Sequence, residues 1–245
     1  MGKNIILIFG GDGKIAKAVV NKYLMNEGVI VIAVDRKESC DNPSLNDNPN
    51  YHYYSCDITD LNQLSNLYQT IENEFGYVTH IISMAGAPCP NEEKGIDEMT
   101  YEDIDNSLKL NINSHIYITK MYLPLIRKCN SNNKSMIYFS SINALKSFNL
   151  PAYSAGKAGI YGFMNSIVRE LGKEQIRVNT ISPGTVASKE EVAMKEDFWG
   201  YGYRDMMALK RFTYPEDIAN ACYSITDIAT AITGQNIVVD SGQIV

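Results

Sequence analysis

Short, almost continuously apolar stretches alternate with longer amphipathic segments along nearly the whole chain. The apolar stretches have strand length, and their lack of a polar face is typical of parallel strands covered on both sides. The longer segments have helical length and periodicity. The predicted strands are Asn4–Phe9, Val29–Asp35, Tyr51–Cys56, Thr79–Ala85, Ser135–Ser140, Arg177–Ser182 and Asn236–Val239, and the predicted helices are Ile15–Asn26, Leu61–Phe75, Tyr101–Cys129, Ala152–Lys173 and Pro215–Ile225.

This repeated strand–helix order predicts an α/β fold, a doubly wound, mostly parallel sheet of seven strands with helices on both faces. No linker is long enough to divide the chain, so residues 1–245 are expected to form one domain of Rossmann type. Residues 189–211 interrupt the alternation with aromatic and methionine side chains among charges. An insertion this late in such a sheet lies beside the carboxyl ends of the strands, which predicts a substrate lid. A surface hairpin or an oligomer contact is the alternative.

Composition narrows the class of protein further. The net charge is −6 with no long basic run, which argues against nucleic acid as a partner. The five cysteines are scattered and include no CxxC pair, so a reduced cytoplasm is expected and no metal site is predicted. No apolar stretch approaches 18 residues, so no membrane span is expected.

The first predicted strand is followed by a glycine-rich turn, Gly-Gly-Asp-Gly-Lys-Ile-Ala at residues 10–16, and then by a helix. Gly11, Gly13 and Ala16 have the spacing of a dinucleotide-binding turn, in which glycine lets pyrophosphate approach the backbone at a helix N-terminus. Asp35 ends the second strand, where a carboxylate can accept hydrogen bonds from both ribose hydroxyls. The pattern predicts a site for a nicotinamide dinucleotide.

The choice between the two nicotinamide dinucleotides depends on the charges near this site. Asp35 would repel a 2′-phosphate and therefore favours NAD(H). Arg36 and Lys14 are close enough in sequence to favour NADP(H) instead. NAD(H) is preferred because the carboxylate occupies the expected position, and NADP(H) stays possible.

Tyr153 and Lys157 lie four residues apart, so on a helix they share one face. About one such pair is expected by chance from this composition, so its meaning depends on its surroundings. An ammonium beside a phenol favours the phenolate and should lower the tyrosine pKa. Ser141 follows a predicted strand end on the same rim of the sheet, where its hydroxyl can bind a substrate oxygen. Asn111 lies inside a predicted helix, where asparagine is a modest helix former and can have a polar task.

Taken together, these residues resemble the short-chain dehydrogenase/reductase family, of the compact single-domain type. The resemblance covers almost the whole chain. The segments that carry it are Gly10–Ala16, Cys56–Ile58, Ser83–Gly86, the tetrad Asn111, Ser141, Tyr153 and Lys157, and then Arg177–Gly184, Pro215–Ala219 and Thr233–Gly242.

The resemblance implies a role for each member of this tetrad. Tyr153 would be the general acid in carbonyl reduction and the base in alcohol oxidation. Lys157 would lower its pKa and bind the nicotinamide ribose, Ser141 would orient the substrate oxygen, and Asn111 would hold a water in a proton relay. The cofactor-binding residues would be Gly10, Gly11, Asp12, Gly13, Lys14, Ile15, Asp35, Arg36, Asp57, Ile58, Ala85, Gly86, Tyr153, Lys157, Pro183, Gly184, Val186 and Ser188.

Four positions depart from the family pattern. Phe9 replaces a threonine, Lys14 and Ala16 replace glycines of the cofactor turn, and Ser83 replaces an asparagine. The departures in the cofactor turn leave open an alternative, a dinucleotide-binding sensor or scaffold without catalysis. An isomerase or dehydratase with a tightly held cofactor is a third possibility.

The first hypothesis is an NAD(P)-dependent oxidoreductase acting on a secondary alcohol or its ketone. Its substrate pocket is expected between Ala87–Gly95, Asn143–Leu150 and the lid. A polar hydroxylated metabolite, such as a sugar-like or cyclic alcohol, and a hydroxyacyl chain both fit this pocket. No basic cluster near the lid demands a phosphate or CoA handle, which slightly favours a small uncharged substrate. From the family, a homotetramer is the expected assembly, with a dimer next.

Overall fold

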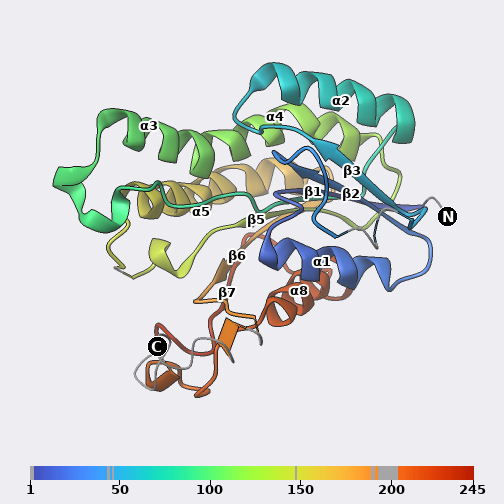
Figure 1. Ribbon diagram of the computed structural model, residues 1–245. Helices are drawn as coiled ribbons and strands as arrows, with labels where there is room; N and C mark the ends of the chain where they lie inside the picture. The colour runs from blue at the N-terminus through green and yellow to red at the C-terminus, as the bar shows by residue number, and fades with distance from the viewer. Residues whose placement is uncertain (1–2, 43–44, 46, 147, 189–190, 193–203) are drawn as a thin grey trace.

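The computed structural model describes residues 3–42, 45, 47–146, 148–188, 191–192 and 204–245 (Figure 1). Its centre is a seven-stranded sheet in the order β3-β2-β1-β4-β5-β6-β7, in which every neighbouring pair is parallel. The predicted doubly wound α/β fold is therefore confirmed. The strands are β1 (Asn4–Phe9), β2 (Val29–Asp35), β3 (Tyr51–Ser55), β4 (His80–Ser83), β5 (Lys134–Phe139), β6 (Ile176–Pro183) and β7 (Asn236–Val239).

Helices cover both faces of this sheet. The α-helices are α1 (Lys14–Leu24), α2 (Leu61–Phe75), α3 (Tyr101–Leu108), α4 (Ser114–Arg127), α5 (Pro151–Gly172) and α8 (Pro215–Tyr223), and the short helical turns are η2 (Glu92–Lys94), η3 (Ile96–Glu98), η4 (Lys109–Asn113), η5 (Ile142–Ala144) and η6 (Ser224–Ile228).

Two hydrophobic layers hold the helices to the sheet, and β1 shows how one strand serves both. Leu7 and Phe9 pack with residues of α2, α4 and α5 on one face, whereas Ile6 and Ile8 pack with residues of α1 and α8 on the other (Figure 1). Successive side chains of a strand point to opposite faces. The almost continuous apolar stretches of the sequence are explained by these two buried faces.

The predicted boundaries agree with the structure to within two residues at most ends, with one informative exception. The predicted helix Tyr101–Cys129 is in fact α3 and α4 joined by η4, a π-helical turn. A π turn inserts an extra residue in the helix and re-aims the side chains there, and such turns are frequent at functional sites. Asn111 lies within η4.

The carboxyl edge of the sheet contains the point at which strand order reverses, between β1 and β4. Parallel sheets of this kind bind ligands at such a point. The turn after β1 contacts the segment after β4 at this point. Gly10 has φ +80°, and a Cβ on it would come within 2.7 Å of the Ala85 nitrogen. Only glycine allows this close approach.

The predicted lid lies largely outside the described residues, including Phe198, Trp199, Tyr201 and Tyr203. Of its described part, Met207 is fully buried with Phe212 and Ala187 in a small hydrophobic cluster. Within the described ranges, no helix is long and apolar enough to span a bilayer, and no cluster of His, Cys, Asp and Glu side chains is arranged to hold a metal ion.

Candidate active site

The glycine-rich turn between β1 and α1 presents backbone amides at the carboxyl edge of the sheet. The amides of Gly10 and Gly11 both donate to the carbonyl of Val34, which fastens the turn to β2. Gly13 is the N-cap of α1, and no side-chain cap is formed among the residues that the structure describes, so the positive end of the helix dipole is not neutralised by a capping side chain. This is an arrangement suited to an anion.

Asp12 differs from what the cofactor-binding prediction implies for its side chain. Its carboxylate is almost fully buried and accepts a hydrogen bond from Lys37 Nζ at 2.8 Å and from the Asp41 amide at 3.2 Å, with Lys17 Nζ at 3.6 Å. These partners hold the loop after β2 against the glycine turn. The Asp12 side chain is therefore directed to a structural cluster, because a buried carboxylate needs partners of opposite charge.

Asp35 is fixed at the end of β2 as the sequence predicts. Its Oδ2 accepts from the Asp12 amide at 3.1 Å and its Oδ1 from the Arg36 amide at 2.8 Å. Asp35 and Arg36 both line a cavity of about 410 Å³ that opens at the switch point. The carboxylate is thus positioned in advance beside that cavity.

Eight of the predicted cofactor-binding residues line this cavity, and the others do not. Lining it are Gly10, Gly13, Asp35, Arg36, Asp57, Ile58, Ala85 and Gly86. Gly11 lies behind the turn, where a Cβ would meet Ala33 at 2.8 Å, and Lys14 forms an ion pair with Glu191. Ile15 packs beside the α1 face of the core and does not line the cavity.

The predicted nicotinamide-end residues follow β6 on the same edge but outside the lining of that cavity. Pro183 ends β6, and Gly184 packs against Asp240 so closely that a Cβ would lie 2.6 Å from the aspartate Cβ. Val186 pairs with Thr213 in an isolated parallel bridge, and the Ser188 hydroxyl accepts from the Glu191 amide. The structure brings these four residues to the carboxyl edge of the sheet, next to the end of β6.

Asn111 is fully buried where η4 packs against α5. Its Nδ2 donates to the carbonyls of Ala87 at 2.8 Å and Ser107 at 3.0 Å. Its Oδ1 has no hydrogen-bond partner among the described residues. A buried oxygen of this kind requires a water or a ligand atom as a donor, so Asn111 fits the predicted role of holding a water.

Lys157 is also buried, one turn beyond Tyr153 on α5, and its Nζ donates to the carbonyls of Phe139 at 2.9 Å and Ala85 at 3.4 Å. Gly86 separates it from Asn111: a Cβ on Gly86 would overlap Lys157 Nζ and lie 2.7 Å from Asn111 Oδ1. Burial lowers the pKa of Lys157 to about 7 because the charged ammonium loses its hydration. The amine can therefore both take and give a proton near neutral pH.

Tyr153 is half-buried near the start of α5, with Lys157 Nζ 5.7 Å from the centre of its ring. Burial raises its pKa above the usual value, the nearby Ser141 hydroxyl opposes this rise, and the charge of Glu92 adds to it. The expectation that Lys157 lowers the Tyr153 pKa is therefore wrong for this structure, since desolvation prevails and Lys157 itself tends to lose its charge. Ser141 is nearly buried at the start of η5, and its Oγ accepts from the Asn143 amide at 3.1 Å.

A larger cavity, of about 780 Å³, lies beside the tyrosine and is formed by the two segments expected to line the substrate pocket. Residues 93–96 make one wall, residues 143–146 and 148–151 make the other, and Ser154 joins them next to Tyr153. Lys94 and Lys146 are in the lining. The sequence reasoning missed this pair of cations because the two lysines are 52 positions apart and far from the predicted lid.

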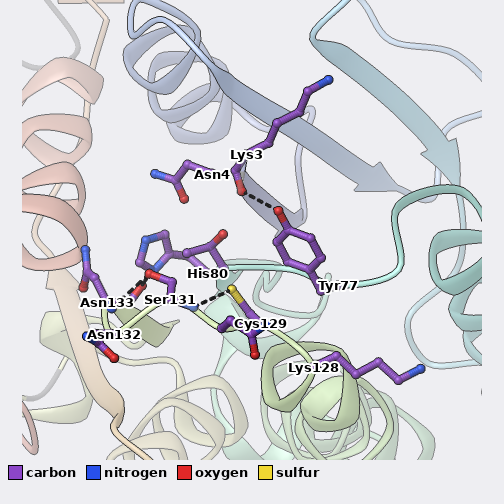
Figure 2. A pocket seen from close by; sticks show the side chains of 11 residues that line it. Lys3, Asn4, Tyr77, His80, Lys128, Cys129, Ser131, Asn132 and Asn133 are labelled. Carbon is purple, nitrogen blue, oxygen red and sulfur yellow. Dashed lines mark hydrogen bonds between the residues drawn. The ribbon is translucent and has the colours of Figure 1, made fainter. Parts of the chain in front are cut away.

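A further cavity, of about 700 Å³, lies at the opposite, amino-terminal edge of the sheet (Figure 2). Asn4, Tyr77 and His80 are among its lining residues, and the Tyr77 hydroxyl donates to the Lys3 carbonyl. Burial lowers the pKa of His80 to about 3, and its Nδ1 shares a hydrogen bond of 2.8 Å with Ser135 Oγ. This neutral ring connects β4 to β5. The lining of the cavity includes none of Asn111, Ser141, Tyr153 and Lys157.

The stability cost of burying Lys157 can be measured. In the unfolded chain this lysine keeps its proton up to about pH 10.5, but in the folded protein only up to about pH 7. Between these two pH values Lys157 takes up a proton on unfolding, so the free energy of unfolding increases as the pH rises. Below pH 7 the buried amine is charged, and its full desolvation cost opposes folding. Lys157→Met should therefore raise the free energy of unfolding by about 1–3 kcal/mol at pH 6, and by less at pH 10. Denaturant melts at the two pH values test this; equal or lower stability of the variant at pH 6 would contradict it.

The site can be compared with known proteins. The profile of a protein family described as enoyl-(acyl carrier protein) reductase matches residues 13–243. A carbonyl reductase family member 4 from Xenopus laevis is 27% identical over 240 residues, covering 97% of both chains. A 7alpha-hydroxysteroid dehydrogenase from Bacteroides fragilis is 24% identical over 247 residues, covering 97% of this chain and 93% of the other.

Among solved structures, a short chain dehydrogenase from Leptospira borgpetersenii with bound NAD+ superposes with a TM-score of 0.85. It is 22% identical, and the match covers 100% of this chain and 94% of the other. This likeness shows the shared fold.

Proposed function

The chain belongs to the short-chain dehydrogenase/reductase family, and from this premise we propose that it is an NAD(H)-preferring oxidoreductase that interconverts a ketone and a secondary alcohol of a small metabolite. The observation that carries the proposal is the meeting of Asn111, Lys157 and Gly86 at the switch point of the sheet, with Tyr153 and Ser141 beside them. The candidate proton-transfer groups are thus adjacent to the cavity at the switch point, since Gly86 lines that cavity.

The residues of the groove fit a nicotinamide dinucleotide. Gly10 and Gly86 keep the surface free of side chains, the uncapped N-terminus of α1 faces the edge, and Asp35 stands ready for ribose hydroxyls. The Oδ1 of Asn111 is a buried acceptor that needs a donor. When bound, the dinucleotide supplies or accepts the hydride.

We propose that Tyr153 gives a proton to the carbonyl oxygen during reduction. Its raised pKa keeps the phenol protonated at neutral pH, which is the form a general acid requires. The Ser141 hydroxyl, which in this structure donates to Asn143 Oδ1 at 3.2 Å, would turn to the same substrate oxygen and fix its direction.

Lys157 and Asn111 would restore the proton that Tyr153 loses. Lys157 has a pKa of about 7, so it exchanges protons readily near neutral pH. Asn111 Oδ1 lies on the other side of Gly86, where it can accept from a water that joins the relay. The carbonyl hydrogen bonds from Lys157 to Phe139 and Ala85 keep the amine directed to this point.

The cofactor preference rests on Asp35 and has a direct test. Lys37, on the loop after β2, forms ion pairs with Asp12 and Asp41, so Arg36 is the cation that lines the cavity beside Asp35. We expect a kcat/KM for NADH at least about tenfold above that for NADPH, and Asp35→Ala should reduce the ratio by about tenfold or more, since one charge repulsion is worth 1–2 kcal/mol here. Initial rates with both dinucleotides measure this. A preference for NADPH in the wild type, or an unchanged ratio in the variant, would contradict the assignment.

We propose residues 1–245 as one dinucleotide-binding domain, with residues 189–211 as its substrate lid, in a cytoplasmic homotetramer. The cytoplasmic proposal is supported by five free cysteines. The tetramer, with a dimer as the next choice, is supported by family membership and by exposed apolar side chains on α5 and near the C-terminus, among them Tyr161, Val238 and Val245.

A further inference from the structure

Glu92 is a completely buried carboxylate in the connection between β4 and α3. Its Oε1 accepts a hydrogen bond of 2.6 Å from the backbone amide of Tyr153. Its Oε2 accepts from the Cys89 amide at 2.7 Å and lies 3.5 Å from the hydroxyl of Ser107 on α3. One side chain therefore connects the loop after β4, helix α3 and the start of α5.

The N-terminus of α5 lacks the cap that its own sequence would normally provide. The N-cap residue is Leu150, which has no side-chain acceptor, and Pro151 follows it. Tyr153 is the third residue of the helix, and its amide is one of the groups that have no partner inside a helix. Glu92 supplies the missing acceptor from a distant segment, and its charge is favourable at the positive end of a 22-residue helix.

We propose that Glu92 is a positioning residue of the active site, whose buried carboxylate fixes the backbone of Tyr153 and thereby the place of its phenol. This inference rests on the proposed function of Tyr153. A displacement of about 1 Å in a catalytic group can lower a rate by about 100-fold, so a fixed helix start is of direct catalytic value.

The carboxylate also acts on the phenol electrostatically. The groups around Tyr153 are Glu92 from η2, Ser141 from the start of η5, and Lys157 one turn along α5, with His115 of α4 held neutral by burial beyond the lysine. The negative charge of Glu92 disfavours the phenolate and contributes to the raised pKa of Tyr153. Loss of this charge should therefore make the phenol easier to ionise.

The test uses Glu92→Gln, which keeps the shape but removes the charge, with Glu92→Asp as the conservative variant and the exposed Glu98→Gln as the matched control. In Glu92→Gln we expect kcat to fall about tenfold or more while KM for the dinucleotide stays within about twofold. The pH at which alcohol oxidation reaches half its maximum should move to lower values, because oxidation needs the phenolate. Glu92→Asp should recover part of the rate, and Glu98→Gln should behave as the wild type.

Hydrogen exchange of the Tyr153 amide gives a second readout that needs no catalysis. The amide should be protected in the wild type and exchange faster in Glu92→Gln. An unprotected amide in the wild type, or a variant with the exchange and pH profile of the wild type, would overturn the proposal. If the wild type shows no turnover, or Tyr153→Phe stays active, the proposed function fails instead, and the exchange experiment still judges Glu92.

Discussion

Tyr153→Phe is expected to lower kcat for carbonyl reduction by about 10²–10⁴-fold, the usual contribution of a general acid. The ring would keep its packing on α5 while the hydroxyl that meets Ser141 is lost. Because Lys157, Asn111 and the glycine turn are untouched, the dissociation constant for NADH should change by less than about threefold. Steady-state rates and fluorescence titration with NADH measure the two quantities.

Tyr161→Phe is the matched control, since Tyr161 lies on the same helix with 40% of its surface exposed. It should retain wild-type rates. A Tyr153→Phe variant with more than about a tenth of wild-type kcat would show that another group transfers the proton. The alternative, a dinucleotide-binding protein without catalysis, is excluded by any measurable turnover of the wild type, whatever the rate of Tyr153→Phe.

Gly86→Ala is expected to reduce kcat/KM by about 100-fold or more. Gly86 has φ +153°, and an added Cβ would overlap Lys157 Nζ and lie 2.7 Å from Asn111 Oδ1. Both side chains are buried, so neither can move aside without losing its carbonyl partners. The methyl group would thus displace the amine, the amide oxygen and any water between them.

The backbone strain at this φ should also cost about 1–3 kcal/mol of stability. Gly162→Ala provides the comparison, because Gly162 lies within α5 and a Cβ there meets nothing within 4 Å. Glycine-to-alanine at such a site should leave activity intact and stabilise the protein by about 0.4–1 kcal/mol. Equal activity of the two alanine variants would contradict the place given to Gly86 in the site.

The sequence was sufficient for the sheet because burial on both faces leaves a direct mark, the nearly continuous apolar strand. The sequence also predicted that Gly10 and Asp35 lie together at the carboxyl edge, because each directly follows or ends a strand of the sheet. It was insufficient where a side chain has a choice of partners. Asp12 turns toward Lys37 rather than toward the groove, since both residues become neighbours only after the loop following β2 folds back.

The π turn at Asn111 and the cap from Glu92 depend on contacts between distant segments. Asn111 approaches α5 at Gly156, where an added Cβ would lie 2.8 Å from the asparagine Cβ. Glu92 reaches Tyr153 across 61 positions. No local pattern indicates either contact. Spacing did place Tyr153 beside Lys157, but the direction of the tyrosine pKa depends on burial, which spacing does not reveal.

The central claim is that this chain transfers a hydride to a carbonyl carbon with Tyr153 as the proton donor, and deuterium labelling tests it most directly. The wild type and Tyr153→Phe would be incubated with NADH deuterated at C4 of the nicotinamide and with ketones that include a steroid ketone and a 3-oxoacyl thioester. The account predicts an alcohol with one deuterium on the carbinol carbon from at least one ketone, formed by the wild type and almost absent with Tyr153→Phe. Binding of NADH without deuterated alcohol from any ketone, or equal product from both proteins, would contradict it.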